Sequence, residues 1–218
     1  NHNSISNNPH DSMMIPRLLV FTHETNLLDP RTANHTVAQR FIPNILHTIH
    51  IYQQAWSGGN HSQTESKSRS IIPVWFLDNA QCRRALYDIH PELAHYFHQE
   101  PKGMYKADLC RLAALYWTGG YYMDVDLQAI QPVTFASMTT TTNSTTTSFS
   151  TVLMLEGALV FFQAFLASHA QNPILYMSLC IMLQYYAAKD KRDDFIQTTI
   201  QQEMLLSVAT KQQQAPQQ

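Results

Sequence analysis

Apolar residues along the 218-residue chain occur either in short unbroken runs or at helical spacings, and the two patterns alternate. Ile42–Ile51, a run rich in isoleucine and leucine, and the apolar run Ile71–Leu77 are predicted to be buried strands. The shorter runs Tyr121–Met123 and Val152–Leu155 are predicted to be strands as well. Leu127–Ile130 is expected to continue in extended form, so these runs together predict a sheet.

Helical spacing of apolar residues marks several of the intervening segments. Within Asn79–His98 apolar residues recur three and four positions apart and are interrupted by Pro91, which predicts two short helices. Met104–Trp117 is the most regular predicted helix, and the glycine pair that follows is typical of a helix terminus. Ile174–Ala188 and Asp193–Ala209 are predicted to be two further helices. Alternating strands and helices indicate an α/β domain with a mostly parallel central sheet.

Polar segments divide the chain into parts. Residues 1–40 are expected to form a polar, partly disordered leader, and residues 41–210 the folded domain. Residues 137–151 are nearly uncharged and rich in Ser and Thr without an apolar period, so they are predicted to be an insertion in that domain. Residues 211–218 are expected to be a disordered tail. Asn-x-Ser/Thr triplets, which mark glycosylation acceptors but are also common by chance, occur at Asn34, Asn60 and Asn143.

Composition narrows the classes of function. The net charge of −2 and the scattered basic residues give no electrostatic footprint for nucleic acid, so no nucleic-acid partner is expected. Cys82, Cys110 and Cys180 lack zinc-ribbon spacing and allow at most one disulfide, with burial in predicted helices as the simpler interpretation. The longest apolar run, Val152–Ala167, is shorter than a membrane span requires. Because the chain begins at Asn1 rather than methionine, it leaves room for a preceding signal segment or membrane anchor.

Two carboxylates, Asp124 and Asp126, follow the predicted strand Tyr121–Met123. In extended backbone, residues two apart point to the same face at a separation of about 7 Å, here at the sheet edge where open α/β folds bind ligands. Two unpaired carboxylates there would repel each other, and a Mg²⁺ or Mn²⁺ ion that also binds phosphate oxygens would remove this repulsion. A solvated turn is the alternative interpretation of an isolated Asp-x-Asp.

The predicted helix before the glycine pair adds two charged candidates. Asp108 and Arg111 are three residues apart and therefore share one face of that helix. Arg111 lies among apolar neighbours, a position that favours a functional role for its charge. An Asp–Arg ion pair at the edge of the core is the alternative.

These residues resemble a known family. The run from Tyr105 through Arg111, with its Ala-Asp-x-x-Arg, and the Gly-Gly-x-Tyr-x-Asp-x-Asp that ends at Asp126 are similar to the DXD-containing region of family 32 glycosyltransferases. That family includes Golgi α-1,6-mannosyltransferases, inositol-phosphoceramide mannosyltransferases and α-1,4-glycosyltransferases. The stretch Ile42–His47 is similar to the family's first strand, usually I-P-K-x-I-H-Q-x-W.

The resemblance implies a GT-A-type nucleotide-sugar-binding fold and assigns roles to individual residues. Asp126 would ligate Mn²⁺ (or Mg²⁺), and Asp124 would contact the metal shell and the donor. Asp108 and Arg111 would hold hydroxyl groups of the donor sugar, and Tyr122 would pack beneath the metal loop. The catalytic set implied is Asp124, Asp126 and Arg111. The resemblance also places Ile45, Leu46 and His47 along the nucleotide pocket.

The resemblance further implies a metal-dependent, retaining hexosyltransferase of the Golgi or another secretory lumen. The donor would be GDP-mannose or a UDP-hexose, with mannose favoured, and the acceptor a glycan or glycolipid. Two departures stand out: His50 occupies the place of the family's tryptophan, and the usual C-terminal Gly-Pro segment is missing. The fold is therefore expected to be incomplete at its C-terminus. The alternative function is a degenerate or truncated member that binds sugar nucleotide without transfer.

Overall fold

The computed structural model describes residues 15–29, 31, 36–57, 71–133, 149–155 and 158–192. The chain forms two compact units, residues 1–179 and 180–218. The sheet and the candidate site both lie in the first unit.

A five-stranded sheet with the order β2-β1-β3-β5-β4 forms the centre of the first unit. Its strands are β1 (Leu19–Thr22), β2 (Val74–Leu77), β3 (Gly120–Met123), β4 (Phe149–Leu155) and β5 (Ala158–Ser168). β1 pairs in parallel with both β2 and β3, whereas β5 is antiparallel to both β3 and β4. Four strands therefore run in one direction and β5 in the other, which confirms an α/β class with a mostly parallel sheet.

Four labelled helices accompany the sheet: α1 (Thr36–Ser57), α2 (Asn79–Ile89), α3 (Pro91–Gln99) and α4 (Gly103–Thr118). The predicted pair of short helices around Pro91 and the predicted Met104–Trp117 helix are confirmed. Residues 173–192 are also helical, as predicted for Ile174–Ala188. Asp78 caps α2, because its carboxylate accepts a hydrogen bond from the backbone N–H of Gln81 at 2.9 Å.

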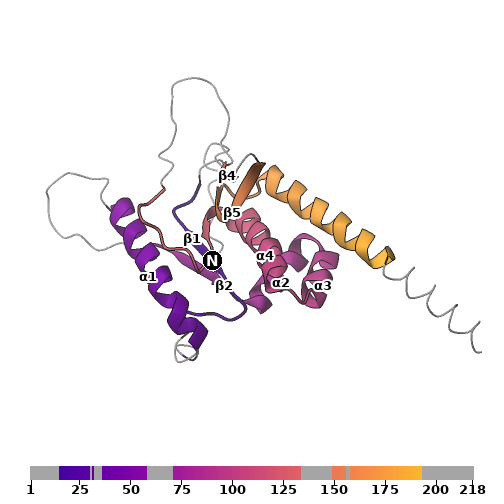
Figure 1. Ribbon diagram of the computed structural model, residues 1–218, viewed down its shortest axis with the longest axis horizontal. Coiled ribbons are helices and arrows are strands. Elements are labelled where there is room, and N and C mark those ends of the chain that lie inside the picture. The colour runs from indigo at the N-terminus through magenta and orange to yellow at the C-terminus, as the bar shows by residue number, and fades with distance from the viewer. Residues whose placement is uncertain are drawn as a thin grey trace, which may run out of the picture. The chain divides into compact units, whose positions relative to one another are not determined.

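The helices cover the two faces of the sheet, with α1 on one side and α2, α3 and α4 on the other (Figure 1). Successive strand residues point to opposite faces, so alternate residues divide between two layers of core. One layer combines strand and α1 residues, namely Leu19, Phe21, Tyr121, Met123, Phe165, Ala167, Ala38, Ile45 and Tyr52. The other face of the sheet carries the buried residues Val20, Tyr122 and Leu166.

The structure corrects the prediction that Ile42–Ile51 is a strand. This segment lies inside α1, where the buried residues Ala38, Ile45, Thr48 and Tyr52 are spaced by seven, three and four positions. Those intervals follow the helical period, which decides the structure despite the β-branched composition of the run. Pro43 is accommodated within the helix at an exposed position.

Several predicted boundaries also change. The segment predicted as a polar leader contains β1, which is fully buried, so the folded domain begins before residue 41. β4 begins at Phe149, inside the predicted insertion, and Leu127–Ile130 forms no strand. Strand β5 was not predicted. Residues 1–14, 134–148 and 193–218, which include the acceptor Asn143, the predicted last helix and the tail, lie outside the described residues, as do Asn34 and Asn60.

The glycine pair makes the turn from α4 into β3 possible. Gly119 and Gly120 have φ values of +63° and +108°, which side-chain-bearing residues rarely adopt. A Cβ at Gly120 would lie 2.7 Å from the carbonyl oxygen of Leu18, and a Cβ at Gly119 would lie equally close to Ser168 O. Both glycines therefore let β3 approach its neighbouring strands directly at the end of the helix.

Two further features bear on the sequence predictions. Cys82 on α2 and Cys110 on α4 form a disulfide, whereas the sequence favoured simple burial, and Cys180 is free. Within the described parts of the chain, no helix combines the length and the apolar content needed to cross a bilayer.

Candidate functional site

A cavity of about 450 Å³ opens at the carboxyl ends of β1 and β3. Thr22, His23 and Glu24 at the end of β1 line it together with Asp124, Val125 and Asp126, which follow β3. The N-terminal half of α4 contributes most of the remaining wall, including Lys106 and Arg111. Because parallel strands end at the same edge of a sheet, the fold brings these residues together, and such edges are the usual ligand sites of open α/β folds.

Asp124 is held in place by Tyr122 and Arg111. The hydroxyl of Tyr122 donates a short hydrogen bond to Oδ1 of Asp124 and lies 3.2 Å from Oγ1 of Thr22. Nη2 of Arg111 lies 3.6 Å from the same carboxylate oxygen. One oxygen of Asp124 is therefore occupied by protein groups, while its Oδ2 makes no hydrogen bond or ion pair with the residues that the structure describes.

Arg111 is almost completely buried and has several partners. Its Nη2 lies 3.1 Å from Oδ1 of Asp108, and its Nη1 donates to the carbonyl oxygen of Gln163 on β5. Its guanidinium carbon lies 5.0 Å from the centre of the Tyr122 ring, so the cation also stacks on the aromatic face. Only 6% of Arg111 is exposed, so it forms a fixed positive charge between two carboxylates.

The electrostatics of the site follow from burial. Burial raises the pKa of Asp108 above its ordinary value; Asp124 adds to this shift, and the nearby Arg111 cation partly opposes it. The pKa of the fully buried Tyr122 hydroxyl is also raised, mainly by desolvation. The phenol therefore stays protonated at neutral pH and can donate its hydrogen bond to Asp124.

Asp126 differs from Asp124 because its side chain is exposed at the cavity and has no recorded partner within the described residues. No group of three or more His, Cys, Asp or Glu side chains that could hold a metal ion occurs in the described ranges. Mg²⁺ and Mn²⁺ are hard cations, and Mg²⁺ is often bound by only one or two carboxylates plus substrate phosphates. The carboxylate of Asp126 and the open oxygen of Asp124 therefore fit a cation that depends on a phosphate ligand.

The three residues predicted to line the nucleotide pocket lie elsewhere. Ile45, Leu46 and His47 are on α1, and none of them lines the cavity. Ile45 is part of the core, and Leu46 and His47 are exposed. Their donor-binding role stays a prediction without support from this arrangement.

Sequence reasoning missed the β1 residues that do line the cavity. Thr22, His23 and Glu24 follow Ile15-Pro16, a basic residue and the apolar run of β1. This stretch has the same order of features as Ile42–His47, namely an Ile-Pro pair, an apolar run and a histidine. The sequence therefore carries this signal twice, and the run at Ile42–Ile51 is the longer of the two.

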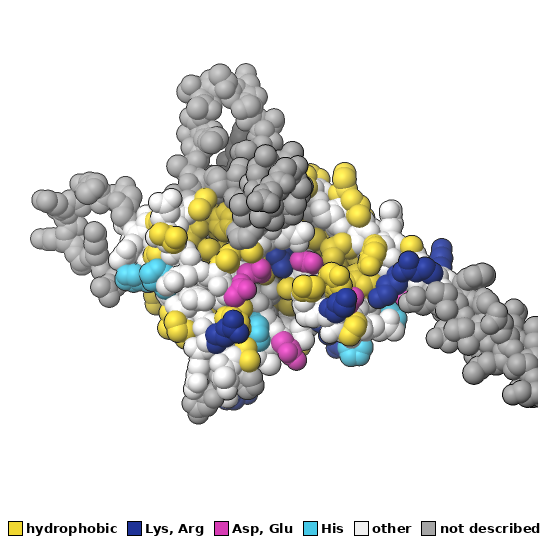
Figure 2. All heavy atoms as spheres, viewed as in Figure 1, with side chains coloured by type: hydrophobic (Ala, Val, Ile, Leu, Met, Phe, Trp, Pro, Cys, Tyr) yellow, Lys and Arg dark blue, Asp and Glu magenta, His cyan; other side chains and the backbone are white. Residues whose placement is uncertain are grey.

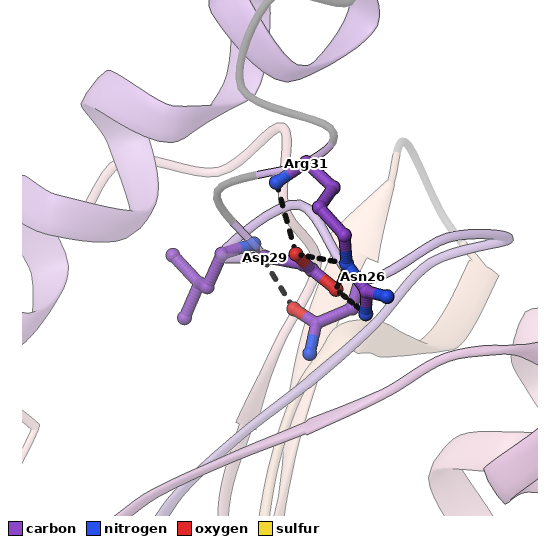
Figure 3. Close-up of polar contacts among 4 residues, drawn as sticks. Asn26, Asp29 and Arg31 are labelled. Atoms are coloured by element: carbon purple, nitrogen blue, oxygen red, sulfur yellow. Dashed lines mark hydrogen bonds and ion pairs between the residues drawn. The ribbon is translucent and has the colours of Figure 1, made fainter.

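Side-chain contacts also order the loop after β1, as Figure 3 shows. Asn26 Oδ1 accepts from the N–H of Leu28 at 3.0 Å, and Asp29 accepts from both the backbone and the guanidinium of Arg31. These hydrogen bonds to Arg31 lower the pKa of Asp29 to about 2.

Near the centre of the face seen in Figure 2, acidic and basic side chains lie next to each other among apolar ones.

Comparison with known proteins agrees with this geometry. Residues 40–147 match the model of a family described as "glycosyltransferase sugar-binding region containing DXD motif". No curated protein matches the chain. The match covers α4, β3 and both aspartates, and it supports a glycosyltransferase-type enzyme. Three residues that line the cavity, Thr22, His23 and Glu24, come before the matched region in the sequence.

Proposed function

We propose, on the premise that the chain is an enzyme of the glycosyltransferase class, that its cavity binds a nucleotide-diphosphate sugar with a divalent cation. The observation that carries this proposal is the pair Asp124 and Asp126 at the carboxyl end of β3, beside the buried cation of Arg111. The reaction proposed is transfer of a hexose to a glycan or glycolipid acceptor.

Asp126 and Oδ2 of Asp124 would hold the cation, Mn²⁺ or Mg²⁺. When bound, the cation would supply Lewis-acid stabilisation of the charge that develops on the departing diphosphate. The hydrogen bond from Tyr122 keeps Asp124 in one orientation, which suits a pair of carboxylates that must act together.

Arg111 and Asp108 would bind hydroxyl groups of the donor sugar. Arg111 is fixed by Asp108, Gln163 and the Tyr122 ring before any ligand arrives, and preorganised charge of this kind is often the largest catalytic contribution. Asp108 and Arg111 would orient the sugar while the acceptor hydroxyl oxygen bonds to the anomeric carbon and the bond to the diphosphate breaks. The acceptor's proton would pass to the diphosphate, with same-face attack and retention, so no protein nucleophile is assigned.

Mannose from GDP-mannose is the favoured donor, and a UDP-hexose is the competing one. The proposed location is the Golgi or another secretory lumen. The disulfide between Cys82 and Cys110 supports an oxidising compartment, because reducing compartments keep most thiols unpaired. The proposal includes a membrane anchor in a part of the protein outside these 218 residues.

Donor hydrolysis without an acceptor tests the reaction class. The wild type is expected to release hexose slowly from GDP-mannose or from one of UDP-glucose and UDP-galactose, only with Mn²⁺ or Mg²⁺ present. Asp126→Asn should lower the rate by about 100-fold or more, since changes to outer-shell partners of a metal already cost about 10- to 100-fold.

The matched control is Glu92→Gln, because Glu92 is an exposed carboxylate on α3 that does not line the cavity. This variant should keep the wild-type rate. Hydrolysis that survives both a chelator and Asp126→Asn would contradict the proposal. Donor binding without hydrolysis or transfer would instead indicate a protein that only binds sugar nucleotide.

A further inference from the structure

Helix α1 carries a row of three hydrogen-bonding side chains, Asn44, Thr48 and Tyr52, which we call the polar row. The three residues are four positions apart, so they lie along one face of the helix. This face is turned toward the chain segment that follows the aspartate pair, residues 125–133.

Each member of the polar row bonds to the backbone of that segment. The amide nitrogen of Asn44 donates to the carbonyl oxygens of Val125 and Asp126, at 3.5 and 3.4 Å. The hydroxyl of Thr48 accepts from the N–H of Ala129 at 3.3 Å. The hydroxyl of Tyr52 accepts from the N–H of Val133 and donates to the carbonyl of the same residue, both at 3.3 Å.

The segment needs these partners because it belongs to no strand. Among the residues of this segment, a backbone hydrogen bond closes one turn, in which the N–H of Leu127 donates to the carbonyl oxygen of Asp124 at 3.1 Å. Buried backbone groups without partners are costly, and Val125 and Ala129 are buried. Thr48 and Tyr52 are themselves fully buried, and burial raises the pKa of Tyr52 to about 12, so its hydroxyl remains a donor.

The two aspartates are therefore fixed in different ways. Asp124 is held through its side chain by Tyr122 and Arg111. The side chain of Asp126 has no recorded contact within the described residues, so its position depends on its backbone, whose carbonyl is bonded by Asn44. Helix α1 does not place Ile45, Leu46 or His47 at the cavity, but its Asn44 contacts the backbone of the aspartate pair at Asp126.

We propose that Asn44 is a positioning residue that sets the carboxylate of Asp126 relative to Asp124 for cation binding. The inference rests on the proposed function, because it assumes that the aspartate pair holds a divalent cation with a nucleoside diphosphate. Asn44 touches neither the cation nor the donor in this role. It acts through the backbone of Asp126.

Mn²⁺ binding with saturating GDP or UDP tests this role without relying on turnover, measured as the loss of the electron paramagnetic resonance signal of free Mn²⁺ beyond the loss that the same nucleotide causes without protein. In Asn44→Ala the dissociation constant for Mn²⁺ should rise about tenfold, as for other outer-shell partners of a metal. The melting temperature without ligands should stay within about 3 °C of wild type, because these long, partly exposed hydrogen bonds contribute little to stability. Asn44→Leu has a similar shape and a higher helix propensity but no donor, so it should show the same loss even if Asn44→Ala folds poorly.

Gln54→Ala, an exposed change on the same helix, is the matched control and should bind Mn²⁺ as the wild type does. Wild-type Mn²⁺ affinity in both Asn44 variants would overturn the positioning role while leaving the proposed function intact. If the wild type and Gln54→Ala bind no Mn²⁺ with either nucleotide, the proposed function itself is overturned. A rise in the dissociation constant confined to the Asn44 variants supports the inference.

Discussion

At the scale of single residues, the site is built from charges that neutralise one another around Arg111. The guanidinium lies between Asp108 and Asp124 and is shielded from water by the fold. Because a buried charge is costly without partners, Arg111 and the two carboxylates stabilise one another. The Asp–Arg ion pair expected as one alternative is therefore present, and a functional role of Arg111 stays a prediction. Asp126 stays outside this network and keeps its charge available.

The raised pKa of Asp108 predicts a specific pH dependence of stability. The folded state binds more protons than the unfolded state between the ordinary pKa of 3.8 and the higher folded value, so the unfolding free energy falls as pH rises through that window. This destabilising contribution is absent at lower pH and fully present above the folded pKa. Asp108→Asn removes it, so the unfolding free energy of this variant relative to wild type should increase as pH rises from below 3.8 through the raised pKa of Asp108.

Urea unfolding across this pH range, with a chelator present, measures the difference. Asp88→Asn serves as the control, since Asp88 is an exposed carboxylate that pairs with Arg84 on α2. A difference for Asp108→Asn that is flat, or that decreases as pH rises, would show that burial does not govern this carboxyl group.

At the scale of elements, α4 is the part of the fold that organises the site. It presents Asp108 and Arg111 from one face and is joined to α2 by the disulfide between Cys82 and Cys110, both of which line the cavity. Its last turn ends at Gly119, whose backbone allows β3 and Asp124 to follow at once. The disulfide therefore supports the wall of the cavity as well as the helix pair.

Removing the disulfide should cost substantial stability. The two cysteines are 28 residues apart, and closing a loop of this size lowers the entropy of the unfolded chain enough to stabilise the fold by about 3–4 kcal/mol. Cys82→Ser is expected to lower the unfolding free energy by that amount in urea without reductant. Cys180→Ser changes the free, partly buried cysteine and should alter it by about 1 kcal/mol or less. Equal stabilities of the two variants would argue against the disulfide.

The elements also show how far sequence patterns reach. The helices around Pro91, the helix that carries Arg111 and the strand before Asp124 were predicted because each has a clear period or a glycine or proline boundary. Ile42–Ile51 was misassigned because β-branched residues favour strands locally, whereas helical packing against the sheet decides the outcome. β1 was missed because the features that mark it, an Ile-Pro pair, an apolar run and a histidine, occur again in the longer run Ile42–Ile51. The contact between Asn44 and Asp126 joins residues that only the tertiary fold brings together.

At the scale of the whole first unit, topology places the chemistry. β1 lies between β2 and β3 in the parallel part of the sheet, so the ends of β1 and β3 open on the same cavity. The family match begins at residue 40, yet Thr22, His23 and Glu24 from β1 complete the cavity. With two available carboxylates and no larger metal-binding group in the described ranges, cation and nucleotide are expected to bind together rather than separately.

Thermal unfolding with Mn²⁺ alone, GDP or UDP alone, and Mn²⁺ with each nucleotide tests the central claim that Asp126 forms a joint metal and diphosphate site. For the wild type, one nucleotide with Mn²⁺ at about 100 times the dissociation constant should raise the melting temperature by about 5–10 °C, well above the sum of the separate shifts. In Asp126→Ala the metal-dependent part of this shift should disappear. A metal-dependent shift of the same size in Asp126→Ala would contradict the account.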